Sequence, residues 1–195
     1  MRAELDTVRA INRRAGEMRS VDLMMDVITR YGHFAFLIYG IILWMLPGEK
    51  RESRRETCVT AFISVCLCSL ISLCIGKIWK RKRPFTKDWR IWNFTGHKAN
   101  SSFPSNHTMN GAAVSVQLLK DGAPGGFCMT FLAGLIAFSR LFAGLHYPTD
   151  LLGGAGIAWG VHRIMNRGTP HKIIKHWTKI LSFLSDTLFL RMRGR

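Results

Sequence analysis

Residues 58–79 form an apolar run with a single charged side chain, Lys77, near its end. A helix needs about 20 mainly apolar residues to cross a bilayer, and this run has that length. No water is present inside a bilayer to satisfy backbone groups, so a helix is the natural structure there, and no strand-like alternation favours a barrel. The run therefore predicts a membrane-spanning helix and argues against an ordinary water-soluble globule.

Further apolar segments extend this pattern. Residues 33–47 are long enough to span if the helix extends backward, and 126–145 form another strong run, broken only by Arg140 near its end. The segments 104–119 and 150–165 are shorter, and the second is rich in glycine, which permits close helix packing. We expect an all-α, integral-membrane bundle of about five transmembrane helices.

Both ends of the chain are basic and amphipathic. Apolar residues alternate with arginines over 1–30, and the segment 168–195 carries apolar residues on one helical face with lysines off it. Such patterns are typical of helices that lie in the membrane interface; a solvated basic arm is the alternative for the first. We divide the chain into an amphipathic arm (1–30), a transmembrane domain (31–167) and a basic amphipathic tail (168–195).

Composition restricts the partners. The formal net charge of +16 predicts acidic partners, which include nucleic acid, anionic lipid and phosphorylated substrates. The position of the charges along the chain decides among these three. Four of the five cysteines lie in one apolar run, and no CxxC pair or His/Cys cluster is present. This argues against a disulfide scaffold or a zinc site, and we expect neither a metal nor a cofactor.

Three polar clusters stand at predicted helix ends: 77–84, 101–107, and a third formed by 139–140 together with 146–150. The first two clusters share one loop. The helix after the second cluster leaves that membrane face, and helix 126–145 returns to it. All three clusters therefore fall on one face, where they can build one site.

The clusters offer groups that bind phosphate. Arg83 and Arg140 can grip phosphate oxygens in bidentate fashion, and a charge within an apolar helix, such as Arg140, is usually functional. Ser105 stands where a helix would begin and offer free N–H groups to an anion. An ordinary juxtamembrane run that binds lipid headgroups is the alternative for 80–83.

The clusters also offer a nucleophile. His146 and Asp150 are four residues apart, so the carboxylate can hold one imidazole nitrogen and leave the other free to attack. His107 can protonate the leaving oxygen. The alternative for this pair is a structural role, in which Asp150 caps the last membrane helix. The remaining histidines have no polar partner at a spacing that indicates a shared site. We expect them to be non-catalytic: His33, His97, His162, His171 and His176.

Together the clusters resemble the three-part signature of the type 2 phosphatidic acid phosphatase superfamily. The third part, in which Ser139-Arg140 precedes His146 and Asp150, is intact. The second part departs at Asn106, where the family usually has glycine. In the first part, Gly76 occupies the family's lysine position, so either Lys77 or Lys80 would fill that role.

Size and layout are most similar to undecaprenyl-diphosphatases of the bacitracin-resistance type, which remove the terminal phosphate of undecaprenyl diphosphate during carrier-lipid recycling. The resemblance implies a haloperoxidase-like helical core, a metal-independent reaction, and a phosphohistidine at His146 with Asp150 in support and His107 as the acid. It also implies a set of phosphate-binding residues: Lys77 or Lys80, Arg83, Ser105, Asn106 and Arg140.

Other functions remain open at this point. The substrate can be another lipid phosphate, such as phosphatidylglycerol phosphate or phosphatidic acid. A non-catalytic basic membrane-binding protein and a haloperoxidase are further alternatives, although a haloperoxidase would be expected to be soluble. The family's site faces outward, which places the basic segment 50–55 inside, as the positive-inside rule prefers. We expect a multi-pass cell-membrane protein with its site on the extracytoplasmic face. Its expected partners are membrane lipids and a lipid diphosphate or phosphate substrate, and not nucleic acid.

Overall fold

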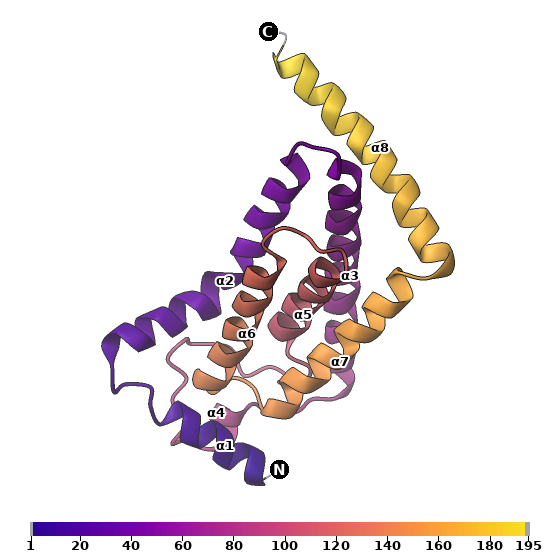
Figure 1. Cartoon of the computed structure of the whole chain (residues 1–195). Helices are drawn as coiled ribbons and strands as arrows, with labels where there is room; N and C mark the ends of the chain where they lie inside the picture. The colour runs from indigo at the N-terminus through magenta and orange to yellow at the C-terminus, as the bar shows by residue number, and fades with distance from the viewer. Residues whose placement is uncertain (1, 194–195) are drawn as a thin grey trace.

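The computed structural model describes residues 2–193, and within them the chain forms helices and no strands (Figure 1). The predicted all-α membrane bundle is confirmed. In chain order the helices are α1 (Arg2–Asn12), α2 (Arg19–Met45), α3 (Arg51–Ile78), α4 (Pro84–Lys87), α5 (Asn106–Lys120), α6 (Gly126–Phe142), α7 (Pro148–Met165) and α8 (Gly168–Arg193).

Helix α5 is the centre of the bundle and packs against α3, α6 and α7, while α2 packs mainly against α6 and α3. Small and medium side chains fill the core between α3, α5 and α7, among them Cys68, Met109 and Ala158. A Cβ atom at Gly111 would lie 3.2 Å from the Cβ of Ala133, so the missing side chain lets α5 and α6 approach closely.

Helices α2 and α3 are both long and apolar enough to cross a membrane, and α6 is a shorter apolar helix. Helices α5 and α7 complete the bundle at the places where the sequence predicts spans. A proline occupies the first turn of α4 and of α7 (Pro84 and Pro148). There the fixed φ of proline favours helix initiation and its missing N–H costs nothing. Figure 1 shows α1 and α4 at one end of the bundle and the α2–α3 turn at the opposite end.

The predicted arm (1–30) consists of α1 and the first part of α2, which continues without a break through residue 30. Helix α1 is docked on the bundle. Its Val8 is fully buried, and the Asn12 side chain donates to the carbonyl oxygen of Phe142 at 2.7 Å and accepts from the backbone N–H of Trp92 at 2.7 Å. Polar contacts therefore tie the start of the chain to the loop between α4 and α5 and to the end of α6. Residue 1 lies outside the described residues.

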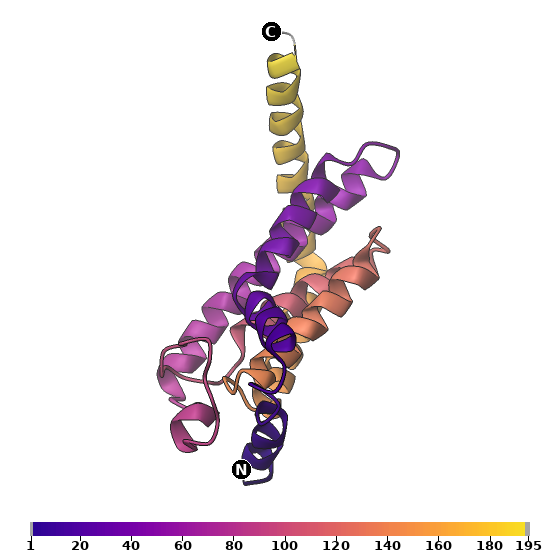
Figure 2. The same cartoon turned by 90° about the vertical axis from the view of Figure 1, so that its left-hand side faces the viewer.

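The predicted tail (168–195) is helix α8; residues 194 and 195 lie outside the described residues. Asp186 on α8 accepts hydrogen bonds from Arg51 at 2.6 Å and from Arg55 at 2.7 Å, which joins α8 to the start of α3. Figure 2 shows α8 extending past the turn between α2 and α3. Large apolar side chains on α8 remain exposed, including Trp177 and Leu184, as expected for a helix in contact with lipid.

Candidate active site

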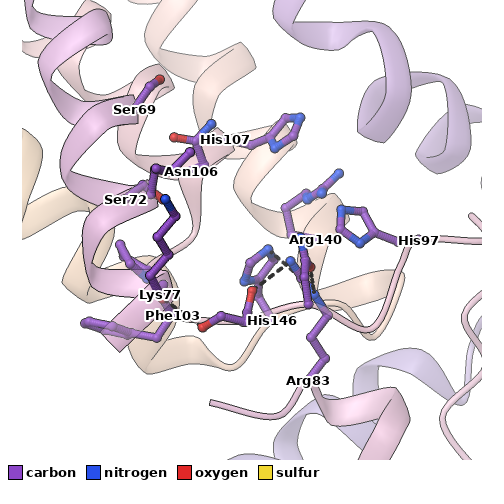
Figure 3. Close-up of a pocket in the computed structure, with 15 residues that line it drawn as sticks. Ser69, Ser72, Lys77, Arg83, His97, Phe103, Asn106, His107, Arg140 and His146 are labelled. Carbon is purple, nitrogen blue, oxygen red and sulfur yellow. Dashed lines mark hydrogen bonds between the residues drawn. The ribbon is translucent and has the colours of Figure 1, made fainter. Parts of the chain in front are cut away.

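At the α1 end, the bundle encloses a cavity of about 470 Å³ (Figure 3). Its wall combines the last turns of α3, the loop between α4 and α5, the start of α5, the end of α6 and the loop before α7. All three polar clusters contribute to it. The predicted site residues that line the cavity are Lys77, Arg83, Asn106, His107, Arg140 and His146.

His146 lies in the buried turn between α6 and α7, and only 3% of its surface is exposed. Its Nδ1 is 2.7 Å from the backbone carbonyl oxygen of Ser102. A carbonyl oxygen can only accept a hydrogen bond, so Nδ1 carries the proton and Nε2 carries the lone pair. Nε2 accepts a hydrogen bond from Nη1 of Arg83 at 3.0 Å. The ring therefore presents a nucleophilic nitrogen on the cavity wall.

The environment of His146 keeps its imidazole neutral. Loss of solvation on burial, followed by the positive charges of Arg83 and Arg140, lowers the pKa of His146 well below its ordinary value. Since the neutral ring is the form with a free lone pair, the nucleophilic form persists into acidic solution.

We expect imidazole nitrogen NMR of the free protein to detect this neutral tautomer directly. The Nε2 signal of His146 should show an unprotonated nitrogen, and Nδ1 a protonated one, from pH 7.5 down through 6.5, because the lowered pKa postpones proton uptake to more acidic pH. A His146→Ala variant assigns the signals. Protonation of Nε2 centred near pH 6.5 would contradict this description of the site.

Arg83 joins three segments of the site. Its Nε donates to Oδ1 of Asn100 at 2.9 Å, and Nη2 donates to the carbonyl oxygen of Ser101 at 3.0 Å. Its Nη1 donates to the carbonyl oxygen of Leu145 at 2.8 Å as well as toward His146. Burial lowers the pKa of Arg83 to about 10, which still leaves the side chain cationic at neutral pH. A fixed cation therefore stands beside the nucleophilic nitrogen.

Arg140 supplies a second buried cation from the last turn of α6. One of its terminal nitrogens donates to the carbonyl oxygen of Thr29 on α2 at 3.1 Å. Among the described residues, its Nε–H has no hydrogen-bond partner. A buried donor without a partner costs free energy, so an anion in the cavity would find this N–H available.

His107 lies in the first turn of α5 and faces the same cavity as His146. Its ring meets the ring of His33 on α2 edge-on, with 5.6 Å between centroids. The two imidazoles on which the sequence argument depends therefore belong to one site.

Asp150 stands behind His146, in the first turn of α7, and is fully buried. Its Oδ2 accepts a hydrogen bond from the backbone N–H of Tyr147 at 2.8 Å and lies 3.5 Å from Nδ1 of His146. The carboxylate is therefore both a helix cap and a charge beside the imidazole. The nearer acceptor of the imidazole proton is the Ser102 carbonyl, which the spacing of His146 and Asp150 did not predict.

Two predicted phosphate-binding residues lie outside the cavity wall. Ser105 is fully buried, and its hydroxyl is 3.0 Å from that of Thr108. Lys80 is exposed, whereas Lys77, on the last turn of α3, lines the cavity. Of the two candidates for the lysine of the first cluster, the structure places Lys77 at the site.

Two residues near the catalytic groups are not distinguished by any pattern in the sequence. His97, expected to be non-catalytic, lines the cavity, and its Nδ1 is 3.0 Å from the carbonyl oxygen of Lys98. Arg81 contacts Asp150 at 2.5 Å. His97 has no partner at a regular spacing, and Arg81 is one of several basic residues in a row, so only the folded loop distinguishes them.

The turn that presents His146 depends on Gly144. Its φ of +67° is in the left-handed region that favours glycine. A Cβ atom there would lie 2.3 Å from Cγ2 of the buried Ile91. Neither the backbone nor the neighbouring side chain leaves room for a methyl group.

Gly144→Ala is therefore expected to lower the free energy of unfolding by about 2–4 kcal/mol, because it combines strained backbone with overpacking. Thermal unfolding of the purified protein in detergent measures the effect. Gly134→Ala is the matched control, since a Cβ at that helical position of α6 has no neighbour within 4 Å. Equal unfolding temperatures for the two variants would contradict the expectation.

The chemistry of the cavity suits a phosphate-sized anion. Lys77, Arg83 and Arg140 line it, and the neutral His146 places a lone pair beside them. In residues 2–193, no group of three His, Cys, Asp or Glu side chains is arranged to hold a metal ion. Cationic donors around a nucleophile are the arrangement that stabilises charge on the oxygens of a transferring phosphoryl group.

Known proteins are similar to this chain in sequence and in fold. Undecaprenyl-diphosphatase BcrC of Bacillus subtilis strain 168 is 28% identical over 139 residues, which cover 71% of this chain and 69% of that protein. The crystal structure of Aquifex aeolicus LpxE superimposes with a TM-score of 0.68 at 21% identity, over 82% of this chain and 92% of LpxE.

A second solved structure has the same fold. It is the first transmembrane PAP2-type phosphatidylglycerolphosphate phosphatase from Bacillus subtilis, with a TM-score of 0.59 at 18% identity over 84% of this chain and 83% of that one. The model of the PAP2 superfamily matches residues 57–173, which contain all three polar clusters. This protein therefore belongs to the PAP2 superfamily, the phosphatase family that its three clusters resemble.

Proposed function

We propose that this membrane phosphatase removes the terminal phosphate of undecaprenyl diphosphate through a phosphohistidine at His146. The observation that carries the proposal is the state of His146: Nδ1–H is donated to the Ser102 carbonyl, and the Nε2 lone pair lies beside Arg83 in a cationic cavity. The similarity to an undecaprenyl-diphosphatase supports the choice of substrate.

In the first step, the Nη1–H of Arg83 turns from Nε2 of His146 to a phosphoryl oxygen, and the freed Nε2 lone pair attacks the terminal phosphorus. The bond from phosphorus to the bridging oxygen breaks, and its electron pair stays on that oxygen, to which His107 gives a proton. Undecaprenyl monophosphate leaves. The imidazole gains positive charge as the P–N bond forms, and the Ser102 carbonyl and the Asp150 carboxylate stabilise it at Nδ1.

In the second step, water attacks the phosphorus of the phosphohistidine. His107 accepts a proton from the water, and the P–N bond breaks with its electron pair returning to Nε2. Inorganic phosphate leaves, and neutral His146 is restored. Arg83 and Arg140 hold the phosphoryl oxygens throughout. Lys77 enters from α3, on the other side of the cavity from Arg140 (Figure 3), where it can hold the phosphate that stays with the lipid.

We propose that the cavity faces outward, as the family resemblance implies. The catalytic cavity lies at the α1 end, and Arg51, Arg54 and Arg55 lie at the start of α3, at the other end. With the basic α2–α3 end in the cytoplasm, as the positive-inside rule prefers, the cavity opens at the extracytoplasmic face of a multi-pass protein.

Phosphate release by the purified protein in liposomes tests the proposal. We expect kcat/KM for undecaprenyl diphosphate to exceed the values for phosphatidylglycerol phosphate and phosphatidic acid by about tenfold or more. Because every reacting group belongs to the protein, EDTA should leave the rate unchanged, and vanadate should inhibit as a phosphate analogue. An acid-labile phosphoprotein should form on rapid mixing.

Each alternative has its own outcome in the same assay. A higher kcat/KM for one of the other two lipids would reassign the substrate and keep the chemistry. Loss of activity in EDTA with recovery on metal addition would overturn the metal-independent mechanism. Salt-dependent binding to anionic vesicles without any phosphate release would indicate a non-catalytic basic membrane protein.

A further inference from the structure

Asp150 is held from two sides. Its Oδ2 faces the backbone N–H of Tyr147 and Nδ1 of His146, while Oδ1 accepts a hydrogen bond from Nη1 of Arg81 at 2.5 Å. A carboxylate with no solvent exposure needs a cation and hydrogen bonds to stay ionised. Among the described residues, Arg81 supplies the cation, and it binds Oδ1, whereas Oδ2 is the oxygen beside the imidazole.

Arg81 is itself fixed by several groups. Its Nη2 donates to Oε2 of Glu4 on α1 at 2.9 Å, and its Nη1 also donates to the hydroxyl of Thr149 at 2.8 Å. The guanidinium carbon lies 4.2 Å from the centre of the Tyr147 ring. Glu4 accepts a further hydrogen bond from Thr149. Helix α1 therefore supplies a carboxylate that locks the side chain that holds Asp150.

We propose that Arg81, held in place by Glu4, is a positioning residue that keeps the Asp150 carboxylate ionised and aimed at His146. The inference rests on the proposed function. Arg81 is not part of the cavity wall, so it acts through Asp150 and does not touch substrate. Arg83, in the same loop, contacts Nε2 of His146, whereas Asp150 lies beside Nδ1 of that ring.

The geometry requires arginine at this position. One terminal nitrogen reaches Asp150, the other reaches Glu4, and the planar group stacks on Tyr147. A lysine has one ammonium group on a flexible stem and cannot make both ion pairs with the same stacking. With Arg81 removed, the buried carboxylate would take up a proton or rotate, and the charge that supports the phosphorylated imidazole would be lost.

The test is a double-mutant cycle on steady-state phosphate release. Arg81→Gln should lower kcat by about 10–100-fold, as loss of a residue that orients a catalytic group does, while KM changes by less than about twofold. Arg81→Lys should recover part of the kcat, and Glu4→Gln should lower it about 2–5-fold. In the Asp150→Asn background, Arg81→Gln should change kcat by less than about twofold, because its target is already neutral.

Lys82→Gln is the matched control, since this exposed neighbour changes the local charge equally. Additive losses in the cycle, or a raised KM with an unchanged kcat for Arg81→Gln, would overturn the positioning role. If Arg81→Gln fails to fold, Arg81→Lys and Glu4→Gln carry the same cycle. Absence of phosphate release by the wild-type protein from every lipid would instead reject the proposed function, so the two failures are distinguishable.

Discussion

His146→Ala is expected to reduce phosphate release by about 10⁴-fold or more, because removal of a nucleophile abolishes the covalent route and leaves only the contribution of binding and charge. The structure places Nε2 of His146 as the unprotonated nitrogen on the cavity wall, next to a fixed guanidinium. The variant should still bind the lipid, since Arg83 and Arg140 remain.

Three measurements check this result, and the first of them excludes misfolding. The unfolding temperature in detergent should stay above the assay temperature, and the acid-labile phosphoprotein should be absent. His176→Ala, which changes an exposed histidine on α8, should retain wild-type turnover. A His146→Ala protein that keeps more than about a tenth of the wild-type rate would exclude a phosphohistidine mechanism.

The fold could be predicted in most of its elements because bilayer physics leaves few alternatives. The apolar run 58–79 lies within α3 (Arg51–Ile78) apart from its last residue, and the strong run 126–145 becomes α6 (Gly126–Phe142). Both runs derive from hydrophobicity and length alone. The docking of α1 could not be derived in this way. It depends on polar contacts such as those of Asn12 with Trp92, whose partners are distant in sequence.

The site could be predicted where side chains that can bind phosphate or transfer a proton stand at a fixed spacing in the sequence. His146, Arg140 and His107 belong to such patterns, and the structure brings them to one cavity. The acceptor of the His146 proton was not predictable, because the backbone carbonyl of Ser102 has no signature in the sequence. Similarly, hydropathy and charge describe 80–83 as one basic run and do not tell which of its side chains points where.

This basic run divides into distinct environments once folded. Lys80 and Lys82 are exposed, Arg81 holds Asp150 from behind, and Arg83 is buried on the cavity wall. An interpretation of the whole run as a lipid-binding patch therefore fits only its lysines. Arg83 contacts Nε2 of His146, and Arg81 contacts Oδ1 of Asp150, so the two arginines bind opposite ends of the His146–Asp150 pair. Replacement of Arg83 by lysine therefore tests whether charge alone is enough at this position.

Arg83→Lys is expected to lower kcat/KM by about 10²–10³-fold, although it preserves the charge. The guanidinium donates at once to Asn100, Ser101 and Leu145 and reaches His146. A single ammonium group cannot replace this planar fork, so the contacts to the three oxygens and to the nucleophile cannot all be kept.

The same substitution should lower the free energy of unfolding by about 1–3 kcal/mol, because the carbonyl oxygens of Ser101 and Leu145 lose their donor in a buried place. Steady-state kinetics and thermal unfolding measure the two effects, and Arg167→Lys at an exposed position is the matched control. Because lysine retains the positive charge, wild-type kcat/KM in Arg83→Lys would show that charge alone stabilises the phosphoryl group. A large loss would show that the directed N–H groups of Arg83 carry the stabilisation, as its hydrogen bonds to three backbone and side-chain oxygens around His146 lead us to expect.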